Sequence, residues 1–171
     1  MHSHSRATRM STLIEGDEIQ RESMQDATRN VLEECRMVLP GIQALFGFQL
    51  IAVINQNFSR VLSEPEQQAH LVALAMSALA IALVMGPAAY HRQVHPHAVS
   101  KAHLRASSWM LTIGMLPLML AILIDIYLMS RVITHSVGIS AAVTGLLSLA
   151  FIGLWIVFPR VIRYRQRGTL L

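Results

Sequence analysis

The carboxylate of Asp125 lies in a long apolar stretch and is the group in this 171-residue chain best placed to do chemistry. If that stretch spans a bilayer, the carboxylate costs up to about 2.5–3.5 kcal/mol at the bilayer centre, so it needs a partner or a proton. On a helix, Ala121, Leu118 and Gly114 share its face. Because two of these residues, Ala121 and Gly114, are small, we expect this face to look into a bundle. We favour an interhelical hydrogen bond or ion pair for Asp125; an ion or proton site is the alternative.

Side-chain amides form a second polar group, at a depth similar to that of Asp125. Gln49, Ala52 and Gln56 lie on one helical stripe, with Asn55 beside it. The candidate partners of Asp125 are Asn55, Gln56 and Asn57, with Arg60 and Arg131 just outside. Inward-facing amides either line a narrow hydrated path or bond neighbouring helices, and bonding is commoner. The predicted polar or ion site comprises Asp125, Gln49, Asn55 and Gln56.

Histidines cluster in one connecting segment, at His91, His95 and His97, with spacings that suit a weak metal site. Pro96 bends this segment, and neither cysteine nor acidic residues lie near to complete the coordination. Contact with lipid headgroups is the favoured role, and we expect no cofactor. The sequence contains no Ser-His-acid set or phosphate loop, and its one cysteine, Cys35, has no activating neighbours, so we expect no enzyme.

Four apolar blocks must position these groups. They are Val38–Phe58, His70–Tyr90, Trp109–Met129 and Val137–Phe158. Each block, as a helix, is roughly 31–33 Å long, which matches a hydrocarbon core of about 30 Å. Apolar residues make up 53% of the chain and charged residues 14%, against about 25% charged in soluble domains, so a soluble monomer is excluded. The sequence predicts an all-α integral membrane protein, an up-down-up-down four-helix bundle.

Segments on either side of the spans complete the predicted organisation. Residues 1–37 form a cytoplasmic segment, in which apolar residues recur every three to five positions from Ile19 to Cys35 and predict an amphipathic helix. Residues 38–158 form the membrane domain, and residues 159–171 form a basic cytoplasmic tail. Within the spans, Ala78, Ala82 and Gly86 form a ladder of small residues, and Gly145 belongs to another small-residue face. Both predict close helix packing.

Basic residues predict the orientation. Twelve of the 14 lysines and arginines lie in the N-terminal segment, the second connection and the tail. By the positive-inside rule these segments are cytoplasmic, and the protein is a multi-pass protein of the bacterial inner membrane. The residues expected to set topology or to touch headgroups are Arg92, Lys101, Arg105, Arg160 and Arg163. No aromatic-interleaved basic face is present, which excludes nucleic acid as a partner.

Two motifs resemble a family of uncharacterised bacterial four-span membrane proteins. They are the segment Pro40–Phe48 and the segment Gly86–Arg92. The resemblance covers roughly Val31 to Arg163 and includes Asp125 and the Gly-Leu-Trp at residues 153–155. It implies an inner-membrane protein and no known activity. The second connection departs from the family because it is rich in histidine where relatives are rich in arginine.

These observations favour a non-enzymatic structural or interaction component. Its partners would be the lipid bilayer and either other copies of itself or the subunits of a larger membrane complex. The alternative is a small oligomeric ion channel or a proton-linked transporter that uses Asp125. A pathway within one chain is disfavoured, because the second and fourth spans offer almost no polar lining.

Reporter fusions test the topology. We expect fusions at the N-terminus, near His97 and at the C-terminus to report cytoplasm, and fusions near Glu64 and His135 to report the opposite side. The asymmetric distribution of basic residues is the physical reason. A periplasmic report at His97 would contradict the four-span topology.

Overall fold

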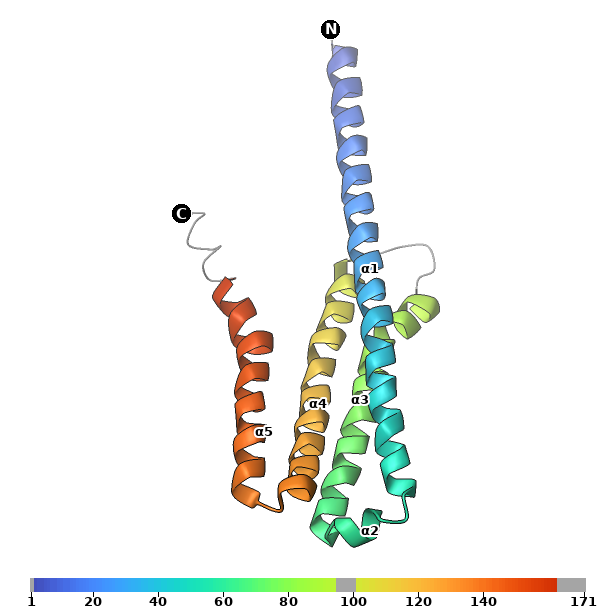
Figure 1. The fold of residues 1–171 in the computed structure, drawn as a ribbon. Coiled ribbons are helices and arrows are strands. Elements are labelled where there is room, and N and C mark those ends of the chain that lie inside the picture. Colours follow the sequence, from blue (N-terminus) through green and yellow to red (C-terminus); the bar gives the residue numbers. More distant parts are fainter. Residues whose placement is uncertain (1, 95–100, 163–171) are drawn as a thin grey trace. The chain divides into compact units, whose positions relative to one another are not determined.

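The computed structural model describes residues 2–94 and 101–162, and over these residues the chain is helical, without a strand. The elements are α1 (His2–Ile54), α2 (Phe58–Val61), α3 (Glu64–Val94), α4 (Lys101–Thr134), α5 (Val137–Phe151) and the π-helix η1 (Ile152–Val157) (Figure 1). Four helical stretches are long and apolar enough to cross a membrane: Asp26–Ile54, Glu64–Ala89, Leu104–Thr134 and Val137–Ile162. The predicted all-α membrane fold is confirmed.

Helix α1 is a single helix that includes both the predicted amphipathic segment and most of the first predicted span. It continues through Pro40, since transmembrane helices tolerate proline where the freed backbone groups find other partners. It ends at Ile54, before the predicted limit at Phe58. The cause is a local turn, in which Asn55 Oδ1 accepts a hydrogen bond from the backbone N–H of Asn57 at 3.0 Å. Asparagine competes in this way with helix continuation.

The chain divides into two units, each described separately below. The first comprises residues 1–43 and 81–114, and the second comprises residues 44–80 and 115–171. The predicted boundaries after residues 37 and 158 both fall inside helical segments, so they remain predictions about depth in the membrane.

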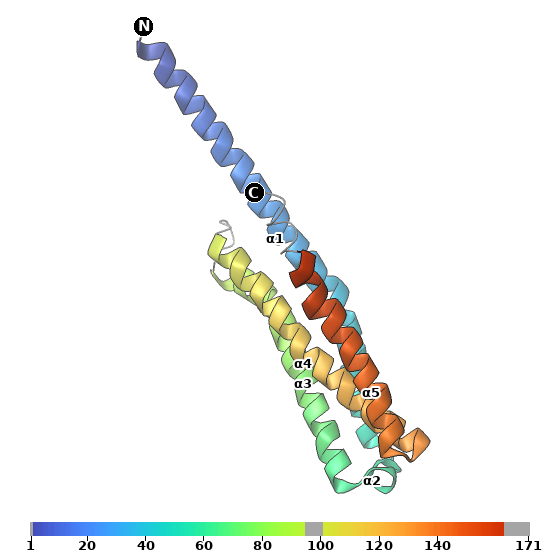
Figure 2. The ribbon, with the colours of Figure 1, turned by 90° about the vertical axis from the view of Figure 1, so that its left-hand side faces the viewer.

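Helices α3 and α4 run antiparallel within the second unit (Figure 2). Glu66 pairs with Arg131, and His70, one turn later on α3, pairs with Asp125, which lies earlier on α4. The buried residues of α3 recur every three or four positions along the whole helix: His70, Ala73, Ser77, Ala80, Val84 and Pro87. Such spacing places them on one face, and the small members of this series permit a close approach of neighbouring backbones.

The connection to α5 is a tight turn with its own polar contacts. His135 has a φ of 51°, in the left-handed region, and Ser136 caps α5 by accepting from the backbone N–H of Ile139. The Ser140 hydroxyl donates to the Ser136 carbonyl at 2.8 Å. Beyond Ser140 the residues of this span are exposed or half-buried, and none of them up to Ile162 is buried. The helix therefore presents its apolar surface to lipid or to another protein.

The last span changes helical type at residues 152–157, which form η1. The Gly-Leu-Trp motif noted in the sequence lies inside this π-helix, and the rings of Phe151 and Trp155 meet edge to face with centroids 4.9 Å apart. Isolated π turns in a longer helix are a recurrent feature of functional regions.

Candidate functional site

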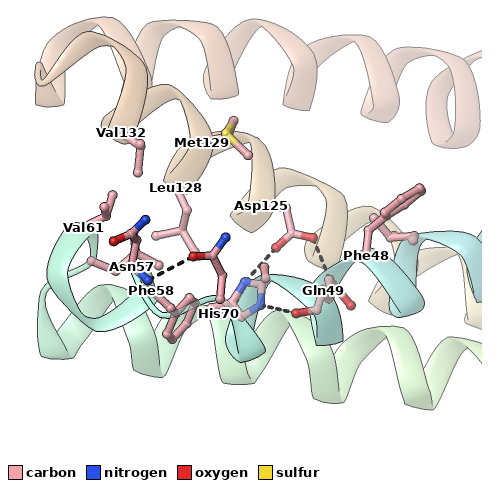
Figure 3. Close-up of a pocket in the computed structure, with 14 residues that line it drawn as sticks. Phe48, Gln49, Asn57, Phe58, Val61, His70, Asp125, Leu128, Met129 and Val132 are labelled. Carbon is pink, nitrogen blue, oxygen red and sulfur yellow. Dashed lines mark hydrogen bonds and ion pairs between the residues drawn. The ribbon is translucent and has the colours of Figure 1, made fainter.

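Three polar side chains from three helices of the second unit meet around Asp125 (Figure 3). Gln49 of α1 donates from Nε2 to Asp125 Oδ2 at 2.6 Å. His70 of α3 places Nδ1 3.4 Å from Asp125 Oδ1, and its Nε2 lies 3.0 Å from the backbone carbonyl oxygen of Gln49. We call Gln49, His70 and Asp125 the polar cluster. It links α1, α3 and α4 by side-chain contacts that do not depend on water.

The polar cluster is largely removed from its surroundings. Gln49 is 3% exposed and His70 is 7% exposed, while the side chain of Asp125 is 22% exposed. Buried polar groups in lipid must find internal partners, and these three side chains supply most of one another's hydrogen bonds. Two oxygens are left over: among the described residues, neither Gln49 Oε1 nor Asp125 Oδ1 has a hydrogen-bond partner.

Each member of the polar cluster is positioned by the buried face of its helix. His70 begins the buried series of α3, and the ring of Phe58 from α2 meets its imidazole edge to face, with centroids 5.3 Å apart. Asp125 lies one turn after Ala121, which is fully buried, and Gly114 is buried on the same helix. The face of α4 that contains Asp125 is therefore oriented inward, as predicted.

The contacts of His70 assign its tautomer. A backbone carbonyl only accepts hydrogen bonds, so the contact to Gln49 O requires a hydrogen on Nε2 of His70. The other ring nitrogen, Nδ1, faces Asp125 Oδ1 at 3.4 Å.

A cavity of about 420 Å³ opens beside the polar cluster (Figure 3). Its walls are mostly apolar side chains of α1, α2 and α4, and its polar lining comes from Gln49, Asn55, Asn57, His70 and Asp125. Phe48 and Met129 form an open rim, since they are 70% and 61% exposed. An apolar hollow with a few convergent polar groups is the usual form of a small-molecule site.

A second polar contact ties α3 to α4 nearer the α2 end. Glu66 accepts a hydrogen bond from Nε of Arg131 at 3.3 Å. Its other carboxylate oxygen accepts from the backbone N–H and the hydroxyl of Ser63, at 2.9 and 2.7 Å. Ser63 and Glu66 thus form part of a capping arrangement at the start of α3. The charges of Glu66 and Arg131 compensate each other, so neither acts as a free charge beside the cavity.

Comparison with known proteins identifies the family. The chain matches a family of unknown function, DUF6328, over residues 17–159. It belongs to DUF6328. The resemblance to an uncharacterised family is confirmed, and the matched region of this DUF6328 protein includes all three residues of the polar cluster. No curated protein and no solved structure matches the chain.

The prediction of the partners of Asp125 was wrong. The partner on α1 is Gln49, which was predicted as a member of the polar site but not as a partner. Asn55 and Asn57 line the cavity without a hydrogen bond to Asp125, and Gln56 and Arg60 are exposed. The reason is the turn after Ile54, which ends the helical stripe on which Gln56 was placed. Arg131 pairs with Glu66 and not with Asp125.

Sequence reasoning on this DUF6328 protein missed His70. The residue begins the second apolar block, and imidazole adds no formal charge to it. The available signal was its place three residues before Ala73 and seven before Ser77, on the face that the structure buries.

Among the described residues, the predicted packing residues are mostly exposed. Ala78 and Ala82 are exposed, and a Cβ built on Gly145 would meet nothing within 4 Å. Gly86 is the exception, because a Cβ there would lie 2.9 Å from the sulfur of Met110, within the first unit. The face that the chain itself buries is the neighbouring one, at Ala73, Ser77 and Ala80.

The predicted cytoplasmic groups of this DUF6328 protein are only partly described. His95, His97 and Arg163 lie outside the described residues, and the side chains of His91 and Lys101 are likewise not described. Arg92, Arg105 and Arg160 are exposed, as headgroup contact requires. Within the described residues, no group of three or more potential ligands could hold a metal ion. Because the side chains of His91, His95 and His97 are not among those described, metal binding by these histidines remains a prediction.

Substitutions at Asp125 test the polar cluster as a structural tie. Asp125→Asn keeps an oxygen to accept from Gln49 and adds an N–H to donate to His70, so we expect near-normal stability. Asp125→Leu leaves Gln49 and His70 without this partner and should lower the free energy of unfolding by ~1–2 kcal/mol. Unfolding of the purified protein in mixed detergent measures both. Equal stability of the Leu variant and the wild type would contradict the tie.

Proposed function

We propose that this protein is a non-enzymatic component of the bacterial inner membrane that associates with other copies of itself or with the subunits of a larger membrane complex. The supporting observation is the exposure of small residues on α3, where Ala78 and Ala82 are not used for packing within the chain. Because lipid provides no hydrophobic drive between helices, small-residue faces permit the close backbone contact on which helix association depends.

The last helical span supports the same proposal. Gly145 lies on α5 with open space around it, and Ala141 and Ala142 on the same helix are exposed. A membrane helix that buries little against its own chain has its apolar surface available for a partner. The polar cluster contributes a fixed arrangement of α1, α3 and α4 on which such a partner could dock.

A matched set of variants tests the association. We expect Ala82→Leu to lower the affinity of self-association, or of co-purification with partner subunits in fixed ratio, by at least about fivefold, with unchanged stability. Ala82→Ser keeps a small residue and should behave as wild type. Ala80→Leu overfills a fully buried position and should instead lower the free energy of unfolding by about 1–3 kcal/mol.

Sedimentation in mild detergent, with chemical unfolding of the same samples, measures association and stability separately. Unchanged association of the Ala82→Leu variant would overturn the proposed contact face on α3.

A second function, an oligomeric ion channel or a proton-linked transporter, is favoured by one specific observation. The ionisable side chains of Asp125 and His70 lie 3.4 Å apart and line a cavity with an open rim. Ionisable groups at membrane depth mark proton and ion pathways in many transport proteins.

Proton flux into liposomes tests this second function. Asp125→Asn keeps the hydrogen bonds but cannot ionise, so a proton pathway should lose its flux although the protein assembles normally. Wild-type liposomes without measurable flux would exclude conduction by the chain alone. An Asp125→Asn protein with full flux would exclude Asp125 as the proton carrier.

A further inference from the structure

The geometry points to the cavity beside the polar cluster as a binding site for a small lipophilic amine in its protonated form. The cavity has a volume of about 420 Å³, within the range of roughly 300–1,000 Å³ that small-molecule sites occupy. Its walls include Leu45, Phe58, Val61 and Leu128, which suit an apolar body. This assignment deepens the transporter candidate, but binding can be measured without any flux.

The polar end of the cavity offers hydrogen-bond acceptors. Gln49 is 3% exposed, and its Oε1 has no partner among the described residues. Asp125 Oδ1 is also buried without a hydrogen bond, at 3.4 Å from His70 Nδ1. Two oxygens that lack donors, one of them on a carboxylate, are complementary to an ammonium group, which has several N–H donors and a positive charge.

Other ligand classes fit the cavity less well. The described residues that line it include a carboxylate but no lysine or arginine. Arg131, the basic residue nearby on α4, is engaged by Glu66 of α3. An anionic ligand would therefore meet Asp125 without an available cation other than His70. A ligand without donors would leave Gln49 Oε1 unpaired, at the cost of a buried unsatisfied acceptor.

Charge complementarity also favours the amine. A carboxylate in a low-dielectric site is costly without a compensating positive charge, and an ammonium group beside Asp125 supplies one. Glu66 and Arg131 pair with each other, so they leave this balance unchanged.

Equilibrium dialysis of the full-length protein in mild detergent tests the site with 1-aminoadamantane as the probe. The matched controls, 1-adamantanol and 1-adamantanecarboxylate, have the same apolar body without the ammonium group. We expect saturable binding of one amine per chain, and binding of both controls weaker by at least about tenfold.

One matched pair of variants and one single substitution separate the cavity from the fold. Ala52→Trp fills the cavity without removing a member of the polar cluster and should abolish amine binding, whereas Ala150→Trp on α5 should not. Asp125→Asn should weaken binding by more than tenfold at normal stability. Equal binding of amine and carboxylate, or full binding by Ala52→Trp, would each overturn the site. Amine binding without proton flux would overturn transport alone.

Discussion

A polar group in the hydrocarbon region of a membrane must find its partners inside the protein, because lipid offers no hydrogen bonds. In this chain that constraint falls on Asp125, the charged residue of the apolar blocks. Its two carboxylate oxygens face different helices, one toward Gln49 of α1 and the other toward His70 of α3. One side chain therefore specifies how the three helices are rotated relative to one another at this depth. Apolar packing alone would allow several such rotations.

The surrounding residues support this interaction from several sides. The turn after Ile54 leads into α2, whose Phe58 contacts the His70 ring and covers it. The Glu66–Arg131 pair, one turn of α3 from His70, fixes the same antiparallel register between α3 and α4. The hydrogen bonds from Ser63 hold the Glu66 carboxylate in place at the start of α3. Directional polar contacts thus set the register and rotation of the helices within the second unit.

The spans were predictable from the sequence because length and apolar content suffice to define them. The inward face of Asp125 was predictable too, since Ala121 and Gly114 share it. Gln49 was correctly included in the predicted polar site, whereas Gln56 was not, because a helical stripe continues only while the helix does. His70 was missed because its partner lies on another helix. The sequence alone did not decide which face of α3 is buried, because small residues occupy two faces. One face has Ala73, Ser77 and Ala80, and the other has Ala78 and Ala82.

The two carboxylate oxygens of Asp125 have different surroundings. Oδ2 accepts from Gln49 and so ties α1 to α4, whereas Oδ1 lies 3.4 Å from His70 Nδ1 without a hydrogen bond. A residue that served only to join helices would need no ligand-sized cavity beside it and no unpaired acceptor on its partner. Both features are present, and they are the observations on which the proposed cation site rests. In that proposal the ligand would meet Oδ1 while the bond from Gln49 to Oδ2 keeps the helices in place.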